Sequence, residues 1–279
     1  MAKILAISSE VVRGHVGNTA ARLALQCLGH EVWALPTVIL SNHVGHAKVA
    51  GLRLEPKLLD EMLEALASNG WIGEIEAVMT GYLPSADHVV LAAEWIARLK
   101  RARPRLHVLC DPVLGDDPMG LYVQEDAAVA VRTHLLPIAD LITPNRFELA
   151  WLTGHDVADR HSARAAARTL PVATVIGTSI PVPGKRELEN VLAGTGQTLI
   201  ARVPKADGPP HGTGDLFAAL YLGHVLAGRT PAEALGRAVG GVKAALESSA
   251  GLDEMRLAPS HQAWGEAVPW PVTTLGEDG

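Results

Sequence analysis

The sequence of 279 residues has few cysteines and only a small net charge. Both features exclude classes of protein. Its two cysteines, Cys27 and Cys110, are too few for a disulfide framework and lack the spacing of a metal site. We therefore expect a reducing, cytoplasmic location. The net charge of −6, with one short basic cluster at residues 100–103, offers little attraction for nucleic acid or anionic membranes.

Long apolar runs and several familiar motifs are also missing. No segment approaches the ~18 apolar residues of a membrane span, and the N-terminus predicts a first strand rather than a signal peptide. The absence of G-x-x-x-x-G-K-[ST], of G-x-G-x-x-G after the first strand and of H-E-x-x-H argues against P-loop NTPases, dinucleotide dehydrogenases and zincins. His43 and His46 are spaced like zinc ligands but have no obvious acid or Cys partner nearby in the sequence.

Short apolar runs alternate with amphipathic stretches, which predicts an α/β fold with a mainly parallel sheet. The expected strands are Ile4–Ile7, Ala77–Met79, His107–Cys110, Leu141–Thr143 and Thr174–Ile176. The expected helices are Asn18–Leu28, Pro56–Ala67, Ser85–Leu99, Asp126–Leu136 and Ser162–Thr169. Two stretches, Gly184–Gly196 and Ala206–Gly214, are expected to be loops, and the chain after Gly251 is expected to be irregular.

Polar residues follow the ends of these expected strands. They are Ser9, Gly81-Tyr82, Asp111, Asn145 and Thr178. Ligands of open parallel sheets bind at the carboxyl ends of the strands, so these residues are expected to line one site.

The segment Gly212-Thr213-Gly214-Asp215 precedes a strongly apolar stretch, Leu216–Ala227, that predicts a buried helix. The free N–H groups and positive dipole at such a helix start stabilise an anion, which makes the turn a candidate phosphate cradle. An ordinary helix start with an Asp in its first turn explains the same residues.

The segment from Thr143 to Glu148 has two interpretations. Asn145 and Glu148 lie three residues apart at a helix start, so they can jointly orient water around Mg²⁺. The same pair is also a capping box. Asp111 and Asp116 add carboxylates after another strand, where Asp-Pro is an ordinary turn as well.

Six segments, in the same order, resemble the pyridoxal kinase family of the ribokinase-like superfamily. They are Gly14-x-Val16-Gly17-Asn18, Ser41-Asn42-His43, Thr80-Gly81-Tyr82, Cys110–Asp116, Ala139–Asn145 and Gly212–Phe217. The resemblance covers roughly Ala6 to Ala250. It implies one three-layer α/β/α domain over residues 1–279, with an irregular tail from about residue 252.

The resemblance also implies an activity: ATP-dependent phosphorylation of the 5′-hydroxymethyl group of pyridoxal, pyridoxine or pyridoxamine. Asp215 would be the base, with Gly212, Thr213 and Gly214 as the anion hole. Ser9, Val16, His43, Val44 and Tyr82 would bind the vitamin. Asp111, Asn145, Thr178, His211, Gly212 and Thr213 would contact ATP, and Asp111, Thr143, Asn145 and Glu148 would serve Mg²⁺. A monovalent cation such as K⁺ and a homodimer are expected too, and no nucleic acid or membrane partner is expected.

The sequence departs from the family at several positions. Val44 replaces a Thr after Ser-Asn-His, and His46 stands where Tyr is common, so the vitamer preference is open. Glu10 replaces a His beside Ser9. One alternative is a hydroxymethylpyrimidine kinase of thiamine synthesis, against which Ser41-Asn42-His43 argues. Another is a non-catalytic vitamin-binding protein on the same scaffold, against which Asp215, Asn145 and Glu148 argue.

Overall fold

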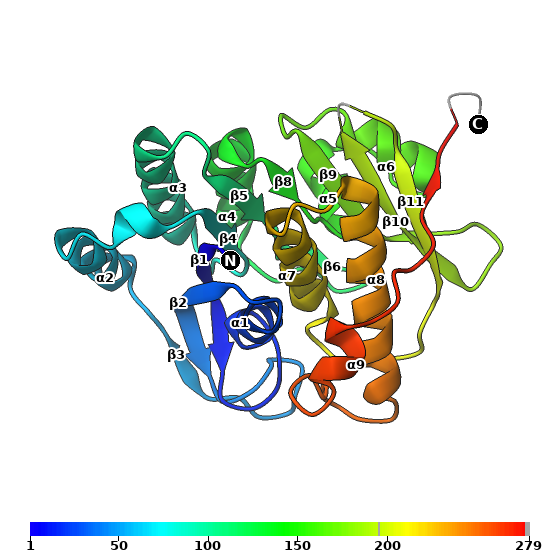
Figure 1. Ribbon diagram of the computed structural model, residues 1–279, viewed down its shortest axis with the longest axis horizontal. Helices are drawn as coiled ribbons and strands as arrows, with labels where there is room; N and C mark the ends of the chain where they lie inside the picture. The colour runs from blue at the N-terminus through cyan, green and yellow to red at the C-terminus, as the bar shows by residue number, and fades with distance from the viewer. Residues whose placement is uncertain (195, 277–279) are drawn as a thin grey trace.

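The computed structural model describes residues 1–194 and 196–276. Within these residues a ten-stranded sheet runs through the molecule, with helices on both of its faces (Figure 1). The strand order is β12-β11-β10-β9-β8-β5-β4-β1-β2-β3. This arrangement confirms the expected three-layer α/β/α fold.

The centre of the sheet is parallel. It consists of β1 (Lys3–Val11), β2 (Glu31–Leu40), β4 (Ala77–Thr80), β5 (His107–Cys110), β8 (Leu141–Ile142) and β9 (Thr174–Pro181). The five strands expected from the sequence are all present, although β1 and β9 extend beyond their predicted ends. Their central residues are nearly all buried because helices cover both faces, which explains the unbroken apolar runs.

The two edges of the sheet are antiparallel. β3 (Gly51–Arg53) pairs with β2 at one edge, and β10 (Glu187–Gly194), β11 (Leu199–Pro204) and β12 (Thr273–Thr274) extend the other edge from β9. The expectation of a loop over Gly184–Gly196 was therefore wrong. The polar residues that suggested a loop are partly satisfied inside the sheet, where the buried Glu189 binds Arg160 and Arg202.

One face of the sheet is covered by the helices from the middle of the chain. These are α2 (Pro56–Ser68), α3 (Ala86–Ala102), α4 (Glu125–Ala130), α5 (Arg146–Thr153) and α6 (Arg160–Ala167). The helix expected over Asp126–Leu136 changes at Val131 into a π-helical turn, Val131–Leu135, and then a 3₁₀ turn, Leu136–Ile138, at Pro137. A short hairpin of β6 (Gly115–Asp116) and β7 (Gly120–Leu121) lies near the start of α5.

The other face carries α1 (Asn18–Cys27), α7 (Thr213–Leu226) and α8 (Pro231–Ser248), with α9 (His261–Gly265) beside α8 (Figure 1). α7 lies between α1 and α8 and is buried along most of its length, as its uniformly apolar sequence predicts. The tail is mostly irregular, yet Met255, Leu257 and Trp264 are buried in this core.

The strand order changes direction at β1. From β1 the chain moves to β2 on one side and later to β4 on the other side. Crevices at such switch points, outside the carboxyl ends of the strands, are where open α/β sheets bind ligands. The fold therefore places a candidate site beside the ends of β1 and β4.

Candidate active site

The ends of β1 and β4 approach each other closely at the switch point. The hydroxyl of Ser8 accepts a hydrogen bond of 3.0 Å from the backbone N–H of Tyr82, and a Cβ at Gly81 would overlap that hydroxyl. The pairing of β1 with β2 shifts register between Ser8 and Glu10, which is a bulge at Ser9. A bulge changes the direction of the side chains beside it, so Ser9 departs from the regular strand geometry next to the candidate site.

A tight turn after β1 brings α1 against the strand. Gly17 has a φ of 54°, and a Cβ there would overlap Ser9, so the turn requires glycine. The next residue, Asn18, is fully buried and donates hydrogen bonds of 3.2 Å to the carbonyl oxygens of Ser8 and Leu35. Asn18 thus joins the turn to two strands, and Val16 is buried immediately before it.

The turn at Gly212 opens α7 toward the same crevice. Gly212 has a φ of 93°, and a Cβ there would overlap the carbonyl oxygen of His15 in the turn after β1. Asp215 lies in the first turn of α7, and the Gly17 N–H faces its carboxylate. Burial raises the pKa of Asp215 to about 6, and the N–H groups of Gly17 and of Asp215 itself oppose that rise.

A second buried carboxylate, Asp111, follows β5. Its Oδ1 accepts a hydrogen bond of 2.7 Å from the hydroxyl of Thr143, which follows β8. Burial first, and the charge of Asp215 second, raise the pKa of Asp111 to about 7. Strongly raised carboxyl pKa values beside a helix N-terminus are typical of catalytic sites.

The pair Asn145 and Glu148 forms the capping box that its spacing predicted. Asn145 Oδ1 accepts from the Glu148 N–H at 2.9 Å, and Glu148 Oε2 accepts from the Asn145 N–H at 2.8 Å. Glu148 Oε1 also accepts from the N–H groups of Leu114 and Gly115 at 2.9 and 3.4 Å. Burial, followed by the charge of Asp111, nevertheless raises the pKa of Glu148 well above its ordinary value.

The predicted Mg²⁺ site involves the carboxylates of Asp111 and Glu148. Within residues 1–194 and 196–276, no group of three or more His, Cys, Asp and Glu side chains is placed to hold a metal ion. Mg²⁺ in kinases is commonly bound by one or two carboxylates together with substrate phosphates and water, and Asp111 suits that arrangement.

The expected nucleotide contacts lie further along the same edge. Thr178, in β9, pairs with Asn145 through an isolated parallel bridge and donates its N–H to the Pro144 carbonyl at 2.8 Å. Its neighbour Ser179 has a φ of 57°. The order β1, β4, β5, β8, β9 thus arranges Ser9, Tyr82, Asp111, Asn145 and Thr178 in a row.

Two histidines join the loop 41–50 to the loop before α7. The rings of His43 and His211 stack with centroids 3.7 Å apart. Burial, then the charges of His211 and His46, lower the pKa of His43 to about 4, so its ring is neutral at neutral pH. Tyr82 is half-buried, with its pKa raised by burial, whereas Val44 is 63% exposed.

Several residues near the site carry no motif in the sequence. Glu10, which replaces the family's His, accepts a hydrogen bond of 2.9 Å from Arg22, so its charge is paired. Glu254, in the irregular tail, contacts Arg13 and His46 in the two loops beside the expected vitamin site. In the sequence, the only hint of this contact is the acidic pair Asp253-Glu254 after Gly251. An exposed charged turn would have the same pattern.

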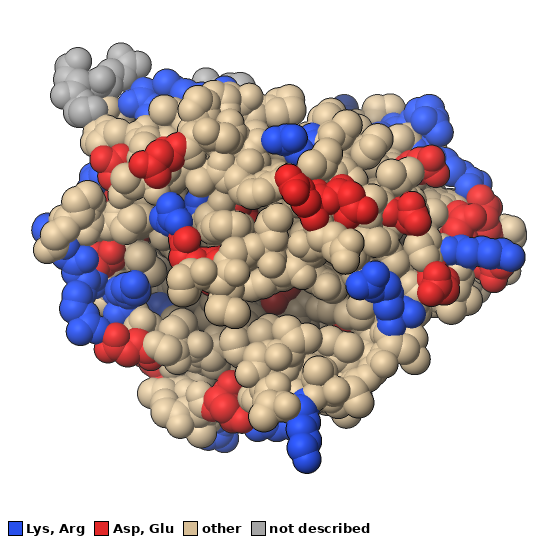
Figure 2. Space-filling view, turned by 180° about the vertical axis from the view of Figure 1, so that it is seen from behind, with Lys and Arg blue, Asp and Glu red and all other residues tan. Residues whose placement is uncertain are grey.

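The face of the molecule drawn in Figure 2 carries charges of both signs. On the face in Figure 2, Lys and Arg are mixed with Asp and Glu, and a hollow across its middle has acidic atoms at its floor. Within the described part of the chain, no helix has the length and apolar character needed to cross a bilayer.

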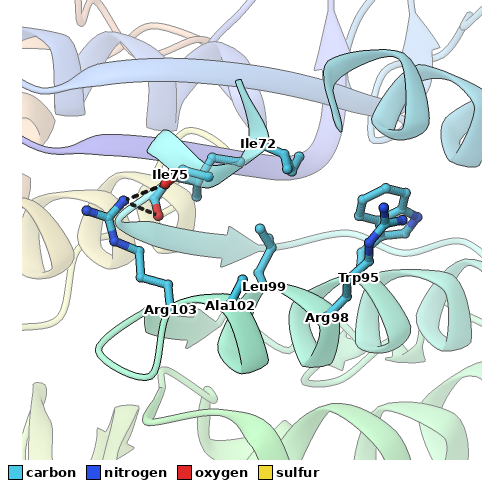
Figure 3. A pocket seen from close by; sticks show the side chains of 8 residues that line it. Ile72, Ile75, Trp95, Arg98, Leu99, Ala102 and Arg103 are labelled. Atoms are coloured by element: carbon cyan, nitrogen blue, oxygen red, sulfur yellow. Dashed lines mark hydrogen bonds between the residues drawn. The ribbon is translucent and has the colours of Figure 1, made fainter. Parts of the chain in front are cut away.

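A separate hollow of about 350 Å³ lies between α3 and the 3₁₀ turn Ile72–Glu74 (Figure 3). Ile75 and Trp95 line it, and Arg103 donates hydrogen bonds of 3.0 Å to the carbonyls of Gly73 and Ile75. Because Ile75 precedes β4, this hollow lies at the amino ends of the strands, away from the candidate active site.

Comparison with known proteins identifies related vitamin kinases. Residues 22–259 match the family model described as phosphomethylpyrimidine kinase. The chain is 35% identical to pyridoxal kinase PdxY of Corynebacterium diphtheriae, over 91% of this chain and 92% of that protein. It is 39% identical to the pyridoxine/pyridoxal/pyridoxamine kinase of Bordetella avium, over 81% and 78% of the two chains.

A solved structure agrees with the fold. Pyridoxal kinase from Leishmania donovani, in complex with ADP and pyridoxamine, superposes with a TM-score of 0.93 at 30% identity, over 99% of this chain and 100% of that one. Sequence and structure therefore agree with the resemblance carried by the six motifs. The chain belongs to the pyridoxal kinase family.

Proposed function

We propose that this protein transfers the γ-phosphate of ATP to the 5′-hydroxymethyl group of pyridoxal or a related vitamin B6 compound. The observation that carries the proposal is the position of Asp215. Its carboxylate lies in the first turn of α7, at the switch-point crevice, with its pKa raised by burial to about 6. A base whose pKa lies near the working pH is suited to accept the proton of a primary alcohol.

For this reaction the protein mainly has to position the two substrates and to supply positive potential around the transferring phosphoryl group. The hydroxyl proton passes to Asp215 while the hydroxyl oxygen forms a bond to the γ-phosphorus and the bond to the β-phosphate oxygen breaks, which releases ADP. The free N–H groups at the turn Gly212–Gly214 face the charge that develops on the transferring group. Gly212 is fixed against His15, so these donors are held in place before the reaction.

The other residues expected from the sequence keep proposed roles along the same edge. We propose that Ser9, Val16, His43, Val44 and Tyr82 contact the vitamin, and that Thr178 and His211 contact ATP near Asn145. Asp111, supported by Thr143, would hold Mg²⁺ together with ATP phosphates, with Asn145 and Glu148 fixing the loop around it. When bound, that cation would neutralise phosphate charge.

Other features remain predictions. K⁺ dependence can be tested by replacing K⁺ with Na⁺ in the assay. A homodimer, for which the exposed edge strand β3 and the exposed Leu52 offer a surface, can be tested by light scattering. A cytoplasmic location is consistent with the two free cysteines, Cys27 and Cys110.

A coupled ATP-consumption assay with pyridoxal, pyridoxine, pyridoxamine and hydroxymethylpyrimidine tests the proposal. We expect the highest kcat/KM for one of the three B6 compounds. The name of the matching family model makes hydroxymethylpyrimidine the necessary competitor. A higher kcat/KM for hydroxymethylpyrimidine would replace the proposal with the thiamine-synthesis alternative, and vitamin binding without ATP consumption would support the non-catalytic one.

A further inference from the structure

A short piece of the C-terminal tail, Asp253–Met255, contacts three loops of the candidate active site. Glu254 Oε1 accepts from Arg13 at 3.1 Å and from His46 at 3.0 Å. The carbonyl oxygen of Met255 lies 2.8 Å from Nδ1 of His15. The side chain of Met255 also lies against the turn at Gly212. Three loops that are far apart in the sequence thus all contact Glu254 or Met255.

The carboxylate of Glu254 is enclosed by these contacts. Its side chain is only 12% exposed, whereas the adjacent Asp253 is 59% exposed although it also binds Arg13. A Cβ at Gly14, whose φ is 99°, would overlap the Glu254 carboxylate. The turn after β1 therefore packs directly on Glu254, and only glycine fits at position 14.

The two oxygens of Glu254 have different surroundings. Oε1 receives both hydrogen bonds, while Oε2 is buried and has no hydrogen-bond partner among the described residues. Oε2 packs against the turn at Gly14. The geometry also implies that one acceptor oxygen is enough to hold both loops.

We propose that Glu254 is a positioning residue for the vitamin. Its Oε1 ties the turn that carries Val16 and Gly17 to the loop that carries His43 and Val44. The two loops follow the neighbouring strands β1 and β2, and the Arg13 N–H donates to the Ser41 carbonyl at 2.9 Å where the loops begin. Glu254 adds a second tie further along both loops, through the side chains of Arg13 and His46. This inference rests on the proposed function, because it assumes that these loops bind the vitamin.

Three substitutions test the proposal with pyridoxal and MgATP. Glu254→Ala removes both hydrogen bonds, and because bonds to charged groups are the stronger class, we expect about a tenfold rise in the KM for pyridoxal. The KM for ATP should stay within about twofold and kcat within about threefold, since the phosphate-binding turn is held by other contacts. Glu254→Gln keeps an acceptor at Oε1 for both Arg13 and His46, so it should restore much of the affinity that Glu254→Ala loses.

A matched control and a double variant complete the design. Asp253→Ala removes the neighbouring, exposed partner of Arg13 and should leave all kinetic constants within about twofold. His46→Ala should raise the KM for pyridoxal, and combining it with Glu254→Ala should add less than the two separate effects. His46→Ala keeps the proposal testable if Glu254→Ala does not fold.

The outcomes separate this inference from the proposed function. A selective rise in the KM for pyridoxal that Glu254→Gln reverses supports positioning by Glu254. Unchanged constants, equal changes in both KM values, or additive effects of Glu254→Ala and His46→Ala would overturn it while leaving the kinase proposal intact. A wild-type protein that does not phosphorylate any B6 compound would overturn the kinase proposal itself.

Discussion

The two ends of the candidate active site are built differently. The phosphate end consists of Asp111, Thr143, Asn145, Glu148 and the first turn of α7. There the side chains bond to one another and to backbone N–H groups at the ends of neighbouring strands and at a helix start. At the vitamin end, which consists of the ends of β1 and β4 with loops 12–17 and 41–50, loops are held by side chains from distant segments. The phosphate end is therefore fixed at strand ends and helix starts, whereas the vitamin end is held together by side chains from a distant segment of the chain.

This difference suggests how the two ends tolerate change. A carboxylate that accepts several backbone N–H groups cannot be replaced without disturbing the turn around it, and Glu148 is such a group. Val44 is exposed, and His46 makes a single side-chain contact. Under the proposed roles, the groups for phosphoryl transfer lie in tightly bonded structure, whereas Val44 lies at an exposed position that accommodates substitution.

The largest effect is expected at the phosphate end, from Asp215→Asn. This change keeps the shape of the side chain and abolishes proton acceptance, and a positioned base contributes about 10²–10⁴-fold, so kcat should fall by that factor. Loss of one charge at a helix start changes stability by only about 0.3–1 kcal/mol, so the melting temperature should scarcely move. Single-turnover rates and ligand affinities on the same variant measure this, and more than about a tenth of wild-type kcat would remove Asp215 as the base.

The second effect concerns the rigidity of the phosphate cradle. Gly212→Ala forces a left-handed residue, at a cost of about 1–2 kcal/mol, and adds an overlap with His15. We expect a lower melting temperature and a fall in kcat of roughly 10²-fold as the N–H donors move. The matched control for stability is Gly214→Ala, where an added Cβ has no heavy atom within 4 Å. Equal melting temperatures for the two variants would show that the cradle is not strained.

Glu148→Gln tests whether the capping box also serves Mg²⁺. Gln can occupy this position of a capping box, but both oxygens of Glu148 accept backbone N–H groups and the NH₂ of Gln would face some of them, so the melting temperature should fall. If Glu148 supports the cation, the Mg²⁺ concentration for half-maximal rate should rise roughly tenfold, as it does for residues that orient metal ligands. A Mg²⁺ titration of the rate measures this. A lower melting temperature with an unaltered Mg²⁺ requirement would leave capping as its whole role.

The smallest effect is expected at the vitamin end, from Val44→Thr. The added hydroxyl should strengthen binding of at least one vitamer by about 0.5–1.5 kcal/mol, the net size of a typical hydrogen bond. Because Val44 is exposed, Thr is accommodated without repacking. Dissociation constants for the three vitamers check the change, and no gain for any of them would remove position 44 from the determinants of preference.

Two features of the phosphate end were predictable from the sequence because they follow from local patterns. The capping box at Asn145 and the helix that begins after Gly212 each follow from a few consecutive residues. The polar residues after β5, β8 and β9 came into one row because parallel strands share a carboxyl edge. The same local patterns also fit an ordinary helix start and cap, and it is the resemblance carried by the six motifs that favours a functional role for these residues.

The vitamin end and the antiparallel edge were less predictable because their contacts are long-range. Glu254 meets Arg13 and His46 across more than 200 residues of chain, and no local pattern encodes such a pairing. β10 was missed because its charged residues, such as Glu189, look like a loop until Arg160 and Arg202 are placed beside them. The bulge at Ser9 depends on the register with β2, which one strand alone does not specify.

The pH dependence of kcat/KM for pyridoxal tests the central claim most directly. Burial raises the pKa of Asp215 to about 6, and a general base works only when deprotonated, so the rate should be full above that value and fall as the pH drops through it. We expect about a tenfold loss for each pH unit below that point in the wild type, and a residual rate in Asp215→Asn that lacks this limb. A limb near the ordinary carboxyl value of about 4, or the same limb in Asp215→Asn, would contradict the assignment of Asp215 as the base.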